Sequence, residues 1–174
     1  MDGTDFRIYE PRPFSSKWFS NKFNGPGLRY EVAISIVSGD IVWTSGPHRP
    51  GEKNDLRIFR EGLMGELNLY ERVEADKGYR GEEDYLDTPG DCLGWSEGYT
   101  CEEAKGQFHI KRLLRARHET INRRFKSWSV LGKMFRHHWS LHQKVFKAVV
   151  TITQLQIMYG AYVWDIGAEY KTLL

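Results

Sequence analysis

The chain has 174 residues, of which 40% are hydrophobic and 14% aromatic, and this composition indicates one folded domain rather than a disordered chain. No run of about 18 apolar residues is present, so no membrane span is expected, and the first residues lack the basic and apolar regions of a signal peptide. Two cysteines, Cys92 and Cys101, are too few for a disulfide framework and favour a reducing intracellular compartment. We expect one domain over residues 1–160 and a tail over 161–174.

Charge is distributed unevenly along the chain, although the formal net charge is only +2. Residues 1–104 hold 12 basic and 20 acidic residues, whereas residues 105–147 hold 12 basic residues and the single acid Glu119. A solvated surface helix normally mixes both signs of charge. The basic segment therefore predicts a polyanionic partner, and nucleic acid is the partner it favours.

Alternating apolar residues predict three strands in the first part of the chain. Phe6 and Ile8 indicate a strand over 2–8, which we expect to be truncated because only Met1 precedes Asp2. Residues 28–37 and 41–45 alternate in the same way around a Ser-Gly-Asp turn at 38–40, and they predict a β-hairpin.

Two further acids stand at the ends of predicted elements. Asp55 follows a proline-containing loop and precedes apolar residues at helical spacing, so it is a plausible helix N-cap. Val73 and Ala75 indicate a short strand that ends at Asp76, just before Gly78. An aspartate before a glycine is often only a turn former, but the carboxyl end of a strand is also where open sheets place their sites.

The strongest predicted helix covers residues 107–128. Its apolar stripe is Ile110, Leu114, Ile121, Phe125 and Trp128. The opposite face carries Arg112, Arg115, Glu119, Arg123 and Lys126. Glu119 therefore lies at the centre of a basic face, where an ion-pair ladder with Arg115 and Arg123 is the simple alternative to a chemical role.

The remaining segments carry weaker signals. Residues 82–103 are poorly periodic and predict loops and short pieces, and 130–138 predict a turn into a short strand. Residues 143–158 predict a largely buried helix that includes Ile152 and Leu155. His137, His138 and His142 lack a pattern of cysteine or acidic partners, so surface or phosphate-contacting roles are favoured over zinc binding.

Four acids form a candidate set without cysteine or histidine: Asp2 by the first strand, Asp55 before a helix, Asp76 after a strand and Glu119 on a helix. Carboxylates alone suit hard, oxygen-seeking ions such as Mg²⁺ or Mn²⁺. Two such ions about 4 Å apart can serve phosphodiester chemistry, and a basic surface beside them is what a DNA substrate needs.

Four ordered motifs resemble those of the Harbinger-type DDE transposases and their domesticated nuclease relatives. They are Asp2-Gly3-Thr4, then Asn54-Asp55-Leu56-Arg57 with the preceding Gly46, then Ala75-Asp76-Lys77-Gly78-Tyr79, and last the segment 118–126, His-Glu-Thr-Ile-Asn-Arg-Arg-Phe-Lys. The spacings between the four acids are 53, 21 and 43 residues, and the resemblance covers about residues 2–155.

The resemblance implies an α/β fold of the RNase H-like type, with a mixed five-stranded sheet flanked by helices. It implies a catalytic triad of Asp2, Asp76 and Glu119, with Asp55 as an auxiliary metal ligand, and a two-metal site that uses Mg²⁺ or Mn²⁺. The basic face of the predicted helix would contact DNA phosphates through Arg112, Arg115, Arg123 and Lys126. The resemblance leaves room for a separate DNA-binding partner protein and for a homo-oligomer, and it favours a nuclear or other intracellular location.

Two functions therefore follow from the sequence. The first is a metal-dependent DNA endonuclease or transposase core, which hydrolyses phosphodiester bonds and can transfer 3′-OH ends. The second is an inactive, domesticated DNA-binding or interaction module on the same fold. The truncated first strand favours the second function, whereas the presence of all four acids favours the first.

Overall fold

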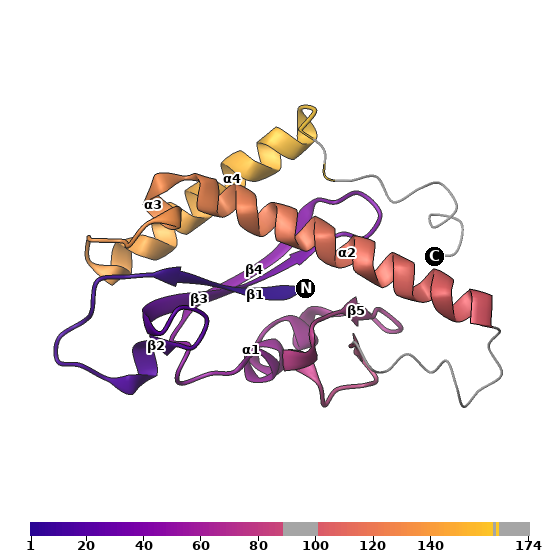
Figure 1. The fold of residues 1–174 in the computed structure, drawn as a ribbon, viewed down its shortest axis with the longest axis horizontal. Helices are drawn as coiled ribbons and strands as arrows, with labels where there is room; N and C mark the ends of the chain where they lie inside the picture. The colour runs from indigo at the N-terminus through magenta and orange to yellow at the C-terminus, as the bar shows by residue number, and fades with distance from the viewer. Residues whose placement is uncertain (89–100, 162, 164–174) are drawn as a thin grey trace.

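The computed structural model describes residues 1–88, 101–161 and 163, with the backbone alone for 101–110. It is a mixed α/β structure, as the sequence predicts (Figure 1). The predicted tail, apart from residues 161 and 163, and most of the predicted irregular segment 82–103 lie outside the described residues, as do the side chains of Cys92, Cys101 and Ile110. None of the described helices is long and apolar enough to cross a bilayer.

The strands form two sheets. The larger sheet is antiparallel, with the central strand β3 paired to β1 on one edge and to β4 on the other, and with β2 at its beginning. The smaller sheet pairs β5 with β6 in parallel. The strands are β1 (Asp2–Arg7), β2 (Phe19–Ser20), β3 (Gly25–Ile34), β4 (Ile41–His48), β5 (Val73–Glu74) and β6 (Leu86–Asp87).

A hydrogen bond of 2.6 Å joins the two sheets, in which the Met1 amino nitrogen donates to the carbonyl oxygen of Glu74. The strands therefore do not form the single five-stranded sheet that the family resemblance implies. The predicted hairpin is confirmed, although β3 begins and ends three residues earlier than predicted and β4 continues three residues further.

The helices lie on both faces of the larger sheet (Figure 1). Alternation along β3 directs Tyr30 and Val32 towards α2 and α4, and it directs Ala33 towards α1. The helices are α1 (Asp55–Glu61), α2 (Cys101–Ser127), α3 (Ser129–Gly132) and α4 (His142–Met158), and the 3₁₀ turns are η1 (Ser16–Trp18), η2 (Leu63–Glu66), η3 (Lys77–Tyr79) and η4 (Trp139–Leu141).

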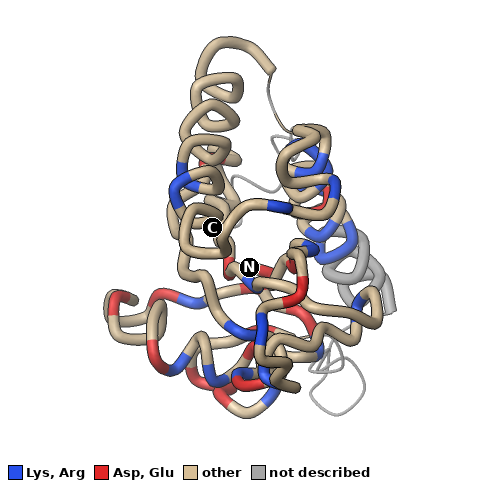
Figure 2. Tube along the Cα trace, turned by 90° about the vertical axis from the view of Figure 1, so that its left-hand side faces the viewer, with Lys and Arg blue, Asp and Glu red and all other residues tan. Residues whose placement is uncertain are grey.

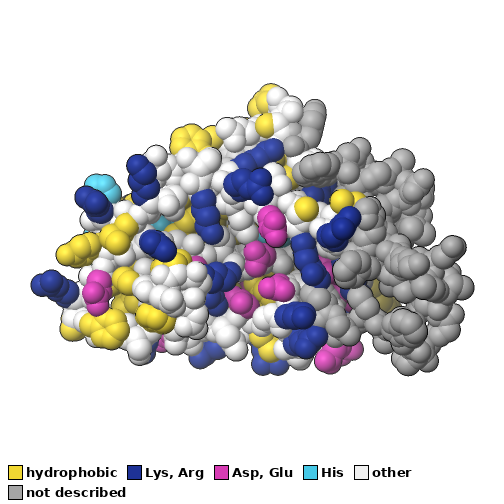
Figure 3. All heavy atoms as spheres, viewed as in Figure 1, with side chains coloured by type: hydrophobic (Ala, Val, Ile, Leu, Met, Phe, Trp, Pro, Cys, Tyr) yellow, Lys and Arg dark blue, Asp and Glu magenta, His cyan; other side chains and the backbone are white. Residues whose placement is uncertain are grey.

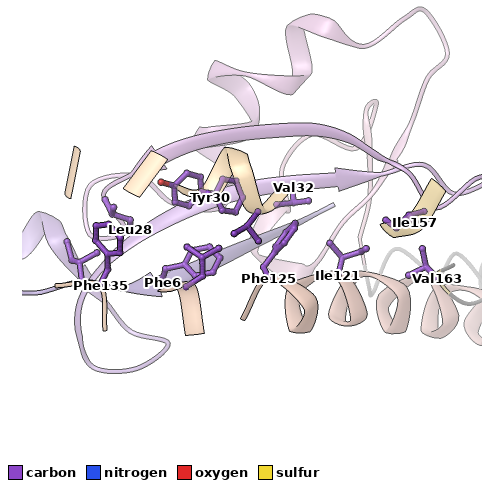
Figure 4. Packing of buried hydrophobic residues seen from close by; sticks show 13 residues of the cluster. Phe6, Leu28, Tyr30, Val32, Ile121, Phe125, Phe135, Ile157 and Val163 are labelled. Carbon is purple, nitrogen blue, oxygen red and sulfur yellow. The ribbon is translucent and has the colours of Figure 1, made fainter. Parts of the chain in front are cut away.

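The main core lies between the sheet and the helices α2 and α4 (Figure 4). Its centre is aromatic, because the rings of Tyr30 and Phe146 stack with centroids 3.9 Å apart and Phe125 meets Phe146 edge-on at 5.5 Å. Aromatic contacts of this kind stabilise a core beyond the burial of their area. The predicted stripe of α2 is confirmed for Leu114, Ile121 and Phe125, whereas Trp128 is 37% exposed.

Three expectations for the C-terminal part are wrong. Residues 130–138 do not form a short strand, because 129–132 close a helical turn and only Phe135 forms a bridge, to Ile8. In α4, Ile152 and Leu155 are exposed because only one side of this helix packs on the sheet. His142 is fully buried, and its Nδ1 lies 2.9 Å from the hydroxyl of Tyr30, so it is a core residue rather than a surface histidine.

Candidate active site

A pocket of about 700 Å³ opens where β1 begins, between β3, β5 and α2. Asp2, Asp76 and Glu119, the three residues of the predicted triad, all line it. They come from the start of β1, from the end of β5 and from the middle of α2. Tertiary folding therefore brings residues that are 74 and 43 positions apart in the sequence to one cavity.

Asp2 is the most enclosed of these acids. Its side chain faces α2, where Asn122 donates a hydrogen bond of 2.9 Å to the Oδ2 atom. Burial raises the pKa of Asp2, the positive charge of Lys22 and of the chain's amino group lowers it, and the charges of Asp55 and Asp76 raise it. The carboxylates of Asp55 and Asp76 are thus close enough to Asp2 to disfavour its negative charge.

Asp76 caps the short 3₁₀ helix η3, because its Oδ1 atom accepts a hydrogen bond of 2.6 Å from the backbone nitrogen of Lys77. The turn-forming role that the sequence suggests is therefore present. Asp76 also lines the pocket, although one of its carboxylate oxygens accepts the capping hydrogen bond.

Glu119 is exposed on α2. No ion pair within 4.0 Å joins it to Arg115, Arg123 or another basic side chain of the described residues. Glu119 therefore does not form the ion-pair ladder with Arg115 and Arg123 that was the alternative to a chemical role.

Asp55 occupies a different position from the other three acids. Asn54, not Asp55, is the N-cap of α1, and its side-chain oxygen accepts a hydrogen bond of 2.9 Å from the backbone nitrogen of Arg57. The predicted capping role of Asp55 is therefore wrong, because the helix begins one residue earlier than the cap assignment assumed. The carboxylate of Asp55 instead pairs with Arg29, whose Nη1 nitrogen lies 3.0 Å from the Oδ1 atom.

Two glycines make room for the Asp55 carboxylate. A Cβ atom on Gly3 would lie 2.6 Å from Oδ1, and one on Gly78 would lie 2.9 Å from Oδ2. Both distances are shorter than real contacts of this kind, so a larger residue at either position would displace the carboxylate. The Asp55 carboxylate thereby lies between Gly3, which follows Asp2, and Gly78, which follows Asp76. Asp55 itself does not line the pocket.

Three residues that the sequence analysis did not single out contact the acids or the backbone beside them. Arg29 is 9% exposed and bridges Asp55 and Asp5, with its Nε nitrogen 2.7 Å from Asp5 Oδ1. Lys22 donates a hydrogen bond to the carbonyl oxygen of Gly3. Only Asn122 gives a signal in the sequence, because it stands three residues after Glu119 and so shares its helix face.

The predicted DNA-contacting residues of α2 are all on its outer side. Arg112, Arg115, Arg123 and Lys126 are exposed. Basic residues follow this helix along the chain trace (Figure 2), and acidic side chains gather near the middle of the face seen in Figure 3, between basic ones. The Nζ atom of Lys126 lies 5.9 Å from the centre of the Phe6 ring, so it has a contact of its own at the edge of the core.

The donor set consists of carboxylates, which suits Mg²⁺ or Mn²⁺ in chemical type. In the described part of the chain, however, no three acidic, histidine or cysteine side chains lie close enough together to hold one metal ion. Asp2, Asp76 and Glu119 line one pocket, and the charges of Asp55 and Asp76 help to raise the pKa of Asp2, but the described carboxylates do not form a coordination shell for one metal ion.

Comparisons with known proteins identify no relative of this chain. No protein-family model matches the chain, and searches of the curated proteins and of the solved structures find no match either.

Proposed function

We propose that this protein is the catalytic core of a metal-dependent DNA endonuclease or transposase of the Harbinger-type DDE class. The observation that carries the proposal is the meeting of Asp2, Asp76 and Glu119, from three separate elements, in one pocket. A second support is that the helix bearing Glu119 exposes a basic face beside this pocket.

The arrangement of strands is compatible with an RNase H-like fold. The order β4–β3–β1 is antiparallel, β5 and β6 are parallel to each other, and the hydrogen bond from Met1 to Glu74 puts β5 next to the start of β1. The proposed fold is therefore one in which α2 crosses one face of this set of strands and brings Glu119 to their ends.

In the proposed mechanism, Asp2, Asp76 and Glu119 would hold the divalent ions. When bound, such ions lower the pKa of an attacking water and stabilise the leaving 3′ oxygen. Asn122 fixes the orientation of Asp2 through its hydrogen bond. Arg115 and Arg123 would position the DNA backbone through its phosphates, which orients a duplex without reading its bases.

A nicking assay on supercoiled plasmid DNA with Mg²⁺ or Mn²⁺, with and without chelator, tests this function. Metal-dependent nicking is expected in the native protein, and Glu119→Gln and Asp76→Asn should each abolish it because a metal ligand is lost. Glu10→Gln changes an exposed acid beyond the far end of β1 and should nick at the native rate. A Glu119→Gln protein with native activity would remove Glu119 from the site.

One observation favours the second function, an inactive DNA-binding module on the same fold. The carboxylates of the described residues are not assembled for metal binding. In this case the protein would bind plasmid DNA in the same buffers and leave it uncut with either metal ion. Binding without nicking therefore separates the two functions.

A further inference from the structure

Two tryptophan rings meet at the opposite end of the larger sheet from the pocket. Trp18 lies in η1 and Trp139 in η4, and their ring centroids are 5.4 Å apart with the planes tilted by 54°. The turn η1 leads into β2, which pairs with the first residues of β3, whereas residues 33–37 at the other end of β3 line the pocket. A strand of ten residues spans about 30 Å, so the two surfaces are well separated.

Hydrogen bonds and close packing fix the backbone that carries both rings. Each of the two 3₁₀ turns is capped by a side chain, η1 by Ser15 and η4 by His138. The loop before α1 lies against η1, since the backbone nitrogen of Gly51 donates a hydrogen bond of 2.9 Å to the carbonyl oxygen of Lys17. A side chain on Gly51 would collide with the carbonyl oxygen of Ser16, so this close approach requires glycine.

The two rings differ in how far they are buried. Trp18 packs against the main core, whereas Trp139 is 39% exposed. The ring of His138 lies beside Trp139, with the centroids 5.4 Å apart, and the guanidinium of Arg49 lies 5.3 Å from the centre of the Trp18 ring. Trp139 is therefore an aromatic surface that the core supports through Trp18 and that remains open to solvent.

The segments that carry these rings are basic. The segment 133–147, which includes Trp139, has no acid and four basic residues, which are Lys133, Arg136, Lys144 and Lys147. Beside Trp18, Lys17 and Arg49 share the single acid Glu52, at 3.3 and 3.1 Å. Hydrophobic and basic side chains lie next to one another at the end of the molecule where β1 ends (Figure 3). Exposed rings in basic surroundings repel a cationic ligand and suit an anionic polymer with flat rings.

We propose that this surface binds single-stranded DNA, with unpaired bases stacked on Trp139 and phosphates held by Lys17, Arg49 and Arg136. Every base has a flat face, so stacking of this kind does not depend on sequence, and cationic side chains follow the phosphate backbone. The bases of a duplex stack on each other, so their faces are not free for Trp139. A proline-rich peptide can also dock on aromatic rings, but it has no negative charge to match the basic residues.

The choice of DNA over RNA rests on the proposed function, whereas the rings and the charges are independent of it. The surface shares no residue with the acids of the pocket or with the basic face of α2. Failure of this proposal in a binding experiment without metal can therefore be distinguished from failure of the nuclease proposal, which the nicking assay tests.

The test uses the full chain with chelator and a fluorescein-labelled oligothymidylate of about ten nucleotides in an anisotropy titration. Saturable binding is expected. An abasic oligomer of the same length, which keeps the phosphates but lacks the bases, should bind about tenfold more weakly. Trp139→Ala should weaken binding of the oligothymidylate by about the same factor and leave binding of the abasic oligomer unchanged. Trp139→Phe keeps a ring and should bind nearly as the native chain does. Trp128→Ala, at a position 37% exposed, is the matched control and should bind both oligomers normally.

Glu52→Gln should act in the opposite direction. It releases Lys17 and Arg49 from their shared acid, so both oligomers should bind more tightly.

Four results would contradict the proposal. The native chain could fail to bind the oligothymidylate, or it could bind the two oligomers equally, in which case charge alone accounts for binding. Trp139→Ala could keep the native affinity for the oligothymidylate. Loss of that affinity in the double variant Arg115→Ala with Arg123→Ala would place the single strand on α2, which removes this site and leaves the proposed function standing. Tighter binding of an oligouridylate of the same length would overturn the choice of DNA.

Discussion

The two ends of β1 lie in contrasting surroundings. Its C-terminal half contributes Phe6 to the aromatic core, where rings stack and the buried His142 forms a hydrogen bond with Tyr30. Its N-terminal half lies at the pocket, where buried polar atoms lack partners among the described residues. They include Glu74 Oε1 and both ring nitrogens of His118, which line the pocket, and Thr4 Oγ1, Glu31 Oε1 and the Tyr79 hydroxyl, which do not; at the aromatic end, the Nε2 atom of His142 also lacks a partner.

The difference indicates what each end is for. A buried polar group without a hydrogen bond costs about 1–3 kcal/mol, so the pocket end is less stable than its burial would allow. Burial also lowers the pKa of His118 to about 3, which keeps its ring neutral. Proteins depart from full polar satisfaction mainly at functional sites. The aromatic end therefore contributes most to the core, and the pocket end is where we propose the functional site.

The largest expected effect is the loss of the aromatic core. Phe146→Ala should lower the free energy of unfolding by about 3–5 kcal/mol, because it removes a fully buried ring that stacks on Tyr30. Urea denaturation measures this change. Ile152→Ala on the same helix, at a position 37% exposed, should cost far less, and an equal loss would contradict the assignment of the core to one side of α4.

Glu31, at the pocket end, should make the protein less stable as pH rises, whereas His118 at the same end acts in the opposite direction because burial lowers its pKa. Burial raises the pKa of Glu31 from 4.5 to about 7, while a hydrogen bond from Trp43 opposes the shift. Its folded form therefore holds a proton that its unfolded form has lost. This contribution to stability is full below pH 4.5 and is lost by about pH 7, a change of about 3 kcal/mol.

The Glu31→Gln variant isolates this contribution, since glutamine does not titrate. The difference in unfolding free energy between native and variant chains should move in favour of the variant between pH 4.5 and 7. If the unfolding free energies of the two chains change in parallel with pH over this interval, Glu31 has an ordinary pKa and its carboxyl group is not buried.

His142, at the aromatic end, should respond to pH in the opposite direction to Glu31. Burial lowers the pKa of His142 from 6.5 to about 4, so the folded form stays neutral where the unfolded form takes up a proton. Its contribution is full above pH 6.5 and is lost as pH falls to about 4, again about 3 kcal/mol. His142→Gln should remove this part of the pH dependence in the same denaturation series and leave the part that His118 contributes, and an unchanged slope would show that His142 does not titrate in this range.

A smaller effect is expected from metal ions, and only at the pocket end. If the acids bind Mg²⁺ or Mn²⁺, a concentration ten times Kd stabilises the fold by about 1.4 kcal/mol through mass action. The melting temperature should rise accordingly in the native chain and stay constant in Asp76→Asn. If millimolar Mg²⁺ and Mn²⁺ leave the melting temperature of the native chain unchanged, the acids do not form a metal site.

The smallest effect on stability, a few tenths of a kcal/mol, is expected for the basic face of α2. Arg115→Ala with Arg123→Ala should weaken DNA binding for all sequences alike. The slope of log affinity against log salt should flatten by about two contacts, at roughly 0.9 per phosphate. Glu119→Gln should bind metal-free DNA as tightly as the native chain or more tightly, because it removes a negative charge. An unchanged salt slope in the double variant would show that DNA uses another surface.

Much of the local structure could be predicted from the sequence. The hairpin over 25–48 follows from period-two alternation around a Ser-Gly-Asp turn, and the buried stripe of α2 follows from its helical spacing. The helix begins six residues earlier than predicted, at Cys101, because the apolar pattern weakens there while the backbone remains helical. Neighbouring capping residues such as Asn54 and Asp55 could not be separated, since both types can cap and only the backbone decides which one does.

The sequence by itself determined the periodicities of its strands and helices, the separation of acidic from basic segments, and the acids that stand near element ends. These features are local, because a period of 2 or 3.6 residues is written in neighbouring positions. Only the tertiary structure decided that Asp2, Asp76 and Glu119 line one pocket while Asp55 lies outside it, held by Arg29 between Gly3 and Gly78. That outcome depends on strand register and on close packing between distant segments, and a shift of one residue in β1 would have turned Asp2 to the other face of the sheet.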